Sequence, residues 1–212
     1  MNEKFFDLKK EKQDRMINAA LKVFALNGYR HASTDDIVRE AAISKGLLFH
    51  YFENKLGVYA FVYDYSVRYL LLELSTAVDA KETDLFTLMQ QVETGKMHAM
   101  CGYPYLQPFL NRAQAENVNE ALVALEERKQ QMEEAYENIY ARADLGKYAA
   151  AEDVVKLRKM MELTIKGLMN ERILEDAFQP EMLYEEILEY LQLSRRLAER
   201  SGQPSDEEIT EK

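Results

Sequence analysis

The stretch STDDIVREAAISKGLLFHYFENK, residues 33–55, decides the fold of this chain. Ser33 or Thr34 can cap a first short helix, and the two aspartates that follow favour the positive end of its dipole. Ser44 can cap a second helix, KGLLFHYF. Because only three or four residues separate the two, the spacing predicts a helix-turn-helix, a motif whose second helix can enter the major groove of DNA.

Helical periodicity extends on both sides of this stretch. Gly28 can end the preceding helix in a left-handed conformation, and Asn54 can cap the following one. We expect Gly102, Pro104 and Pro108 to interrupt helical structure near the middle of the chain. The further predicted helices cover residues 8–27, 55–78, 85–100, 119–142, 151–176 and 181–199, and residues 201–212 are predicted to be disordered.

Composition agrees with an all-α protein. The 212 residues include only four prolines and eight glycines, and 47% of them are hydrophobic. A single cysteine, Cys101, cannot form an internal disulfide, which favours a cytoplasmic location. The start of the chain does not resemble a secretory signal. The most apolar stretch contains Asp64 and Arg68, so membrane insertion is not expected.

Charge is unevenly distributed. The net charge is −10, but residues 1–55 hold ten basic and eight acidic residues, a balance of +2, against −12 for the remainder. Charges separated by more than about 8–10 Å are largely screened in physiological salt, so a basic end on an acidic body can still meet phosphate. This distribution permits DNA binding without demonstrating it.

The longer segment GYRHASTDDIVREAAISKGLLFHYFENKLGVY, residues 28–59, together with the helix before it, resembles the DNA-binding domain of the tetracycline-repressor (TetR) family. The resemblance covers about residues 12–60 and rests on Phe24, Gly28, Thr34, the turn Ile-Ser-Lys-Gly, the run Phe-His-Tyr-Phe and Lys55. Two positions depart from the family pattern. Ala42 stands where glycine is frequent, so the turn must tolerate a Cβ, and Leu47 stands where a small hydroxyl residue is common.

This resemblance implies which residues meet DNA. Lys45 and Gly46 begin the recognition helix, where the helix dipole and free backbone N–H groups favour phosphate. Leu48 and Phe52, four residues apart, are expected to share its buried face. The aromatic end of this helix is therefore predicted to be half core and half DNA-facing. The expected DNA-binding residues are Ser33, Thr34, Ser44, Lys45, Gly46, Leu47, Phe49, His50, Tyr51 and Lys55.

The resemblance also implies a larger helical body. We expect an N-terminal three-helix DNA-binding domain in residues 1–53 and a helical ligand-binding and dimerisation domain in residues 54–200. Methionines and aromatic residues near a Gly/Pro break predict a pocket for a small hydrophobic effector, although the same side chains could form a tight core. The expected pocket residues are Phe61, Tyr65, Tyr69, Met97, His98, Met100, Cys101, Tyr103, Tyr105 and Phe109.

Homodimerisation is expected through the last two long helices, because two recognition helices multiply the specificity of one. The alternative is that their apolar residues close each subunit's own core. The expected interface residues are Met160, Leu163, Leu168, Leu183, Ile187 and Leu191.

Enzyme chemistry is not expected. The chain has three histidines, no phosphate-cradling glycine loop, and only the pair His98 and Cys101 at a metal-ligand spacing, so no cofactor or metal is predicted. The resemblance to the TetR family implies a transcriptional regulator, a ligand-released repressor that binds a palindromic double-stranded operator as a homodimer. The alternative is a helical adaptor that binds a protein partner without DNA.

Overall fold

The computed structural model describes residues 3–148, 150–174 and 178–200. The tail 201–212, predicted to be disordered, lies outside the described residues. Across the described ranges the secondary structure is helical and contains no strand, so the predicted all-α class is confirmed. The elements are α1 (Glu3–Phe6), α2 (Lys10–His31), α3 (Thr34–Glu40), α4 (Lys45–Phe52), α5 (Lys55–Ala77), α6 (Leu85–Gly102), α7 (Leu106–Gln114), α8 (Asn119–Tyr140), the 3₁₀ turn η1 (Leu145–Lys147), α9 (Ala151–Arg172) and α10 (Pro180–Arg200).

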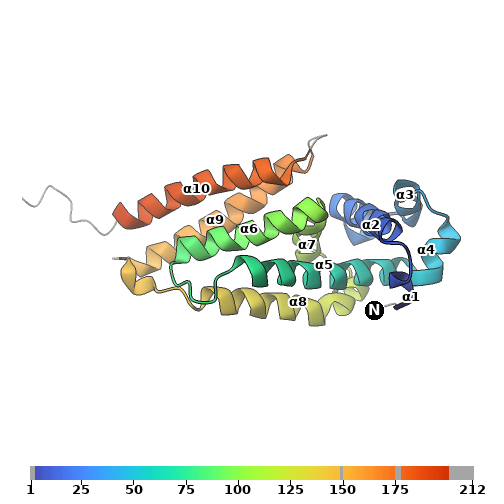
Figure 1. Ribbon diagram of the computed structural model, residues 1–212, viewed down its shortest axis with the longest axis horizontal. Helices are drawn as coiled ribbons and strands as arrows, with labels where there is room; N and C mark the ends of the chain where they lie inside the picture. Colours follow the sequence, from blue (N-terminus) through green and yellow to red (C-terminus); the bar gives the residue numbers. More distant parts are fainter. Residues whose placement is uncertain (1–2, 149, 175–177, 201–212) are drawn as a thin grey trace, which may run out of the picture.

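Helices α1 to α4 gather at one end of the elongated molecule, and α5 runs from them into the body (Figure 1). In the body, α5 packs against α6 and α8, while α10 packs against α6 and α9. No helix among the described residues is both long and apolar enough to cross a membrane.

Two of the residues that were predicted to interrupt helices, Gly28 and Pro108, differ from the prediction. Gly28 does adopt a positive φ of 66°, but helix α2 resumes after it and ends at His31. Pro108 does not interrupt a helix. It is the third residue of α7, a helix that the sequence analysis missed. A proline is tolerated in a first helical turn because its missing N–H has no intrahelical partner there.

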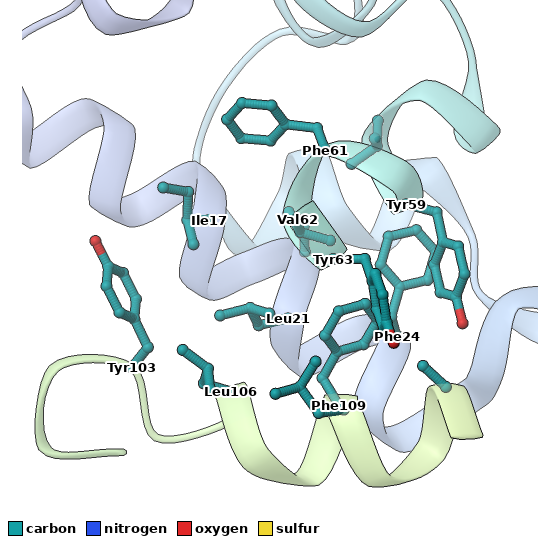
Figure 2. Close-up of a cluster of buried hydrophobic side chains, with 14 of the residues drawn as sticks. Ile17, Leu21, Phe24, Tyr59, Phe61, Val62, Tyr63, Tyr103, Leu106 and Phe109 are labelled. Carbon is teal, nitrogen blue, oxygen red and sulfur yellow. The ribbon is translucent and has the colours of Figure 1, made fainter. Parts of the chain in front are cut away.

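A continuous apolar core joins the helix-turn-helix end to the body. Phe24 of α2 contacts Tyr59 of α5 with ring centroids 4.8 Å apart, and Tyr59 contacts Phe109 of α7 at 5.4 Å. Aromatic pairs at these separations add to the stabilisation that burial alone provides. Figure 2 shows how the side chains from these three helices meet: Ile17, Leu21, Phe24, Tyr59, Val62, Tyr63, Leu106 and Phe109.

A second core lies between α6, α9 and α10 and corrects part of the dimer prediction. Leu183, Ile187 and Leu191 are almost fully buried in it, packed within one subunit. Leu168 is partly buried against the same cluster. These residues recur at three- and four-residue steps, so they form one stripe of an amphipathic helix pair whose other side faces outward.

Candidate nucleic-acid interface

The turn between α3 and α4 has the geometry of a Schellman motif, which ends a helix in a left-handed residue. Ala42 occupies that position with φ 51°. The amide of Ile43 donates to the carbonyl of Val38 at 3.0 Å, and the amide of Ala42 donates to that of Arg39 at 3.2 Å. The turn therefore does tolerate a Cβ where the sequence comparison expects glycine.

Side-chain caps fix where three of these helices begin. The Ser33 hydroxyl accepts the amide of Asp35 at 3.1 Å, and the Ser44 hydroxyl accepts the amide of Leu47 at 3.2 Å. Asn54 caps α5 in the same way. Since a serine hydroxyl that accepts a hydrogen bond keeps its own proton, Ser33 and Ser44 can still donate to a phosphate oxygen.

Helix α4 has two distinct faces. Leu48 and Phe52 are buried, as the four-residue spacing predicts. Lys45, Gly46 and His50 are exposed. The partly buried residues between these faces are Leu47, Phe49 and Tyr51, and Thr34 on α3 is also partly buried. The predicted buried face of α4 is thus confirmed, and the opposite face is exposed and available to a partner.

Helix α1 supports α4 from behind, and the sequence analysis missed it. Phe5 is fully buried, with its ring centroid 5.7 Å from Tyr51 and 5.3 Å from Phe52. Phe61 of α5 completes the contact at 4.8 Å. The paired phenylalanines Phe5 and Phe6 were the available signal. A four-residue helix is too short to show periodicity, so this signal was weak.

Lys45 is held at the protein surface by an ion pair. Its ammonium donates to Asp35 on α3 at 2.8 Å, and both side chains are more than half exposed. An exposed pair of this kind contributes little stability, so the lysine can exchange Asp35 for a phosphate at small cost.

Lys55, at the start of α5, contacts the C-terminal end of α2. Its ammonium donates to the carbonyls of Tyr29 at 2.9 Å and Ala32 at 3.3 Å, and it lies 4.5 Å from the centroid of the Tyr29 ring. A cation at a helix C-terminus is favoured by the dipole. The structure therefore gives Lys55 a capping role at the end of α2, and its phosphate contact stays a prediction.

Gly57 sets the distance between α4 and α5. A Cβ at this position would lie 2.0 Å from the carbonyl oxygen of Phe52, which no side chain can tolerate without a shift of the backbone. Gly46 is different, because a Cβ there meets nothing within 4 Å. Gly57 is therefore a structural requirement for the orientation of the recognition helix, and Gly46 is not required by packing.

A cavity of about 490 Å³ lies in the body between α6, α7, α8 and α9. None of the predicted pocket residues lines it. On α6 the cavity faces Met89, Glu93 and Lys96, which share one face at three- and four-residue steps. Met97 and His98, the next residues along α6, do not line the cavity. The full lining is Met89, Glu93, Lys96, Gln107, Asn111, Gln114, Met132, Tyr136, Glu137, Tyr140, Ala141, Arg158, Glu162, Ile165, Lys166 and Met169.

The predicted pocket residues instead occupy three other places. Phe61, Met100, Tyr103 and Phe109 are buried core residues, and Tyr105 is partly buried against the first core. Met97, His98 and Cys101 lie near or at the surface. No group of three or more His, Cys, Asp or Glu side chains within the described ranges could hold a metal ion.

Tyr65, Tyr69 and Tyr103 form a cluster beside α2. Tyr103 donates to Asp14 of α2 at 2.5 Å, and its hydroxyl lies 2.7 Å from that of Tyr65. Burial, followed by the hydrogen bond to Asp14, raises the pKa of Tyr103. These tyrosines therefore join the body to α2 and do not line an open site.

Comparisons with known proteins agree with this arrangement. Residues 16–60 match the family described as "Bacterial regulatory proteins, tetR family". The chain is 36% identical over 78 residues to the uncharacterized HTH-type transcriptional regulator YuxN of Bacillus subtilis, which is 35% of this chain and 26% of that protein. It is 41% identical over 49 residues to the uncharacterized HTH-type transcriptional regulator TtgW of Pseudomonas putida, 23% of this chain and 37% of that protein.

The likeness to these curated relatives thus spans less than two thirds of their length and centres on the helix-turn-helix. A wider likeness exists at the level of the fold. The crystal structure of a TetR family transcriptional regulator from Chloroflexus aurantiacus covers 93% of each chain with a TM-score of 0.55 and 23% identity. The N-terminal match and the fold agree: residues 16–60 match the tetR family of bacterial regulatory proteins, and the whole chain shares its fold with a solved structure of that family.

Proposed function

We propose that this protein is a repressor that binds a two-fold symmetric operator as a homodimer and is released from it by a small effector. The observation that supports DNA recognition most directly is the exposed face of α4. Lys45, Gly46 and His50 are presented outward there, while Leu48 and Phe52 anchor the helix from behind. A helix N-terminus with an adjacent lysine favours contact with DNA phosphates.

The outer face of α9 and α10 supports a dimer. Met160 is 62% exposed and Leu163 is 59% exposed on α9. On α10, Tyr190, Leu193 and Leu197 are between 39% and 46% exposed. Two apolar helix faces side by side, repeated in a second copy, would form a four-helix contact. This proposed interface keeps Met160 and Leu163 from the sequence prediction and replaces the three leucine and isoleucine residues that are buried within the subunit.

Helix α7 connects the cavity to the DNA-binding end. Gln107 and Asn111 line the cavity. Leu106 and Phe109, on the same short helix, are fully buried in the core shared with α2. A molecule that displaces α7 would therefore move α2, and with it α3 and α4. Helix α5, which also leaves the DNA-binding end, contributes no residue to the cavity.

Release requires that the effector discriminates between two states of the protein. A molecule that bound the DNA-bound and free forms equally would shift nothing, however tightly it bound. We therefore expect effector binding and operator binding to weaken each other by the same factor.

A gel-shift titration against DNA from upstream of the protein's own gene tests DNA recognition. Lys45→Ala should weaken binding and reduce the salt slope by about one per recognition helix, because one phosphate contact is lost in each. Lys156→Ala is the matched control, since it removes a comparable exposed lysine–aspartate pair from α9. We expect this control to bind like the wild-type protein.

The same titration separates the regulator from the alternative of a helical adaptor. An adaptor should show no salt-sensitive, sequence-selective retention of DNA. Equal affinity of the Lys45→Ala and wild-type proteins would remove α4 from the interface.

A further inference from the structure

The cavity between α6, α7, α8 and α9 has an apolar wall with a polar section. Met89, Met132, Ile165 and Met169 supply the apolar part. Methionine side chains adapt to irregular shapes, and a volume near 490 Å³ is within the range of small-molecule sites. The apolar part of the wall therefore suits a ligand with a compact apolar body. The polar groups of the wall determine which charges and hydrogen-bonding groups the ligand can have.

The less exposed charges of the wall are already compensated. The Lys96 ammonium lies 2.7 Å from the Glu93 carboxylate, with both side chains largely buried. Burial alone would lower the pKa of Lys96, but the charge and hydrogen bond of Glu93, together with the neighbouring tyrosines Tyr136 and Tyr140, raise the pKa overall. Arg158 lies 3.4 Å from Glu162 and over the ring of Tyr140. Glu137 and Lys166 also line the cavity, but both are exposed to solvent. A ligand charge placed at the less exposed section would have to break one of these two pairs and leave a charge without its partner, which is costly.

Two neutral polar atoms of the wall are buried without a hydrogen-bond partner: the Oε1 atom of Gln107 and the hydroxyl of Tyr136. Gln107 is 6% exposed, and its Nε2 atom is already used to donate to Asn111 at 2.9 Å. Burial raises the pKa of Tyr136, so its hydroxyl stays protonated at neutral pH and can donate. Buried polar groups are nearly always satisfied in folded proteins, so these two exceptions indicate where a ligand's polar atoms belong.

We propose that the cavity binds an uncharged molecule with a compact apolar body and a polar group that both donates and accepts hydrogen bonds, such as a carboxamide. Its donor meets Oε1 of Gln107, and its acceptor meets the hydroxyl of Tyr136. This inference rests on the proposed function in taking the cavity as the effector site. It narrows the predicted hydrophobic effector to a neutral one with a hydrogen-bonding head.

Calorimetric titration of the full chain with matched probes tests this class of ligand. Each of two apolar bodies, octyl and adamantyl, carries a neutral, an anionic or a cationic head: octanamide, octanoate and octylammonium, and the corresponding adamantane-1-carboxamide, adamantane-1-carboxylate and 1-adamantylammonium. Two apolar bodies are used so that a poor fit of one body to the cavity does not hide the effect of the head group. We expect at least one carboxamide to bind, and to bind at least about tenfold more tightly than both charged probes that share its body, a difference of about 1.4 kcal/mol.

Tyr136→Phe and Gln107→Leu locate the binding. Each should weaken the carboxamide about tenfold, the typical value of one hydrogen bond. Tyr136→Phe should not lower the stability of the free protein, since the hydroxyl it removes has no partner. Tyr184→Phe is the matched control. Its hydroxyl is already paired with Thr94 at 2.7 Å and does not line the cavity, so carboxamide affinity should stay unchanged.

Three outcomes would overturn the proposal: no binding of either carboxamide at millimolar concentration, a charged probe that binds as tightly as the carboxamide, or carboxamide binding that is insensitive to both cavity variants. Because these titrations contain no DNA, they are independent of the gel shift. A carboxamide that binds the cavity but leaves operator retention unchanged would contradict ligand release and leave the ligand class intact.

Discussion

Ala42 holds a left-handed backbone conformation, with φ 51°, at the turn of the helix-turn-helix. A residue with a Cβ is strained in this region by about 1–2 kcal/mol, whereas glycine is not. Replacing Ala42 by glycine would remove this strain. Part of the gain in stability is lost, however, because glycine also increases the conformational entropy of the unfolded chain. We therefore expect Ala42→Gly to raise the free energy of unfolding by about 0.5–1 kcal/mol, measured by urea denaturation. A lower stability of this variant would contradict the assigned turn.

Gly57 allows α4 and α5 to approach closely, since a Cβ would lie 2.0 Å from the Phe52 carbonyl oxygen. We expect Gly57→Ala to destabilise the protein by about 2–3 kcal/mol, as overpacking does, and to weaken DNA binding by displacing α4. Urea denaturation and a gel shift measure the two effects.

Gly46→Ala is the matched control on the recognition helix, where a Cβ meets no protein atom. It should leave stability unchanged or raise it by up to about 1 kcal/mol, because alanine favours a helix. Its DNA affinity should nevertheless fall, since the added methyl group faces the approaching DNA. Equal destabilisation by the two substitutions would show that the contact with Phe52 does not matter.

Single residues were predictable from sequence where the interaction is local. The caps at Ser33, Ser44 and Asn54 depend only on the next two or three residues, and the structure confirms them. Lys55 was not predictable in this way. Its ammonium reaches carbonyls more than twenty residues earlier in the chain, and no local pattern shows that contact.

At the scale of helices, Asp84 links the start of α6 to the end of α10. It accepts the Thr87 amide at 2.9 Å and lies 3.1 Å from Arg195. Burial alone would raise the pKa of Asp84, but these hydrogen bonds and the charge of Arg195 lower it below its ordinary value of 3.8. A carboxyl with a lowered pKa stabilises the fold above that ordinary value, and the contribution is lost as the pH falls through the folded pKa.

We therefore expect Asp84→Asn to be less stable than the wild-type protein at about pH 6, and the difference to shrink as the pH falls below 3.8. Urea denaturation of both proteins across this range measures the effect. A stability difference that is constant with pH would mean that the charge of Asp84 contributes nothing.

Helices with a clear apolar pattern or a capping residue were predicted well, whereas α1 and α7 were missed. Helix α5 was expected over residues 55–78 and is observed over Lys55–Ala77, because 23 residues provide a clear apolar pattern and a capping residue. Helix α7 has nine residues and contains a proline, so the same rules suggested a break. Its position between α2 and the cavity is a tertiary feature, and it determines where the candidate effector site lies.

The whole molecule is expected to assemble through the outer faces of α9 and α10. Leu193→Glu combined with Leu197→Glu should produce a folded monomer, because both side chains are about half exposed within the subunit. Ile187→Glu should instead unfold or strongly destabilise the protein, since that side chain is 2% exposed in the subunit's own core. Sedimentation at micromolar concentration, together with circular dichroism, separates the two results. A double variant that remains dimeric would exclude this face.

The all-α architecture could be predicted from the sequence, but the sequence did not show which face of each helix is buried within the subunit. Periodicity showed that α10 is amphipathic. This left open whether its apolar residues close the subunit or join two subunits. The structure divides them: Leu183, Ile187 and Leu191 face inward, and Tyr190, Leu193 and Leu197 face outward. The predicted pocket residues lie away from the cavity for a related reason, since composition around α6 does not reveal which side of the helix faces open space.

Hydroxyl-radical footprinting of the wild-type protein on DNA from upstream of its own gene tests the central claim most directly, that two α4 helices read one operator. The account predicts two protected segments related by two-fold symmetry, with centres about one helical turn (~34–36 Å) apart or somewhat more, and loss of both in Lys45→Ala at the same protein concentration. Protection without internal symmetry, or unchanged protection in the variant, would contradict it.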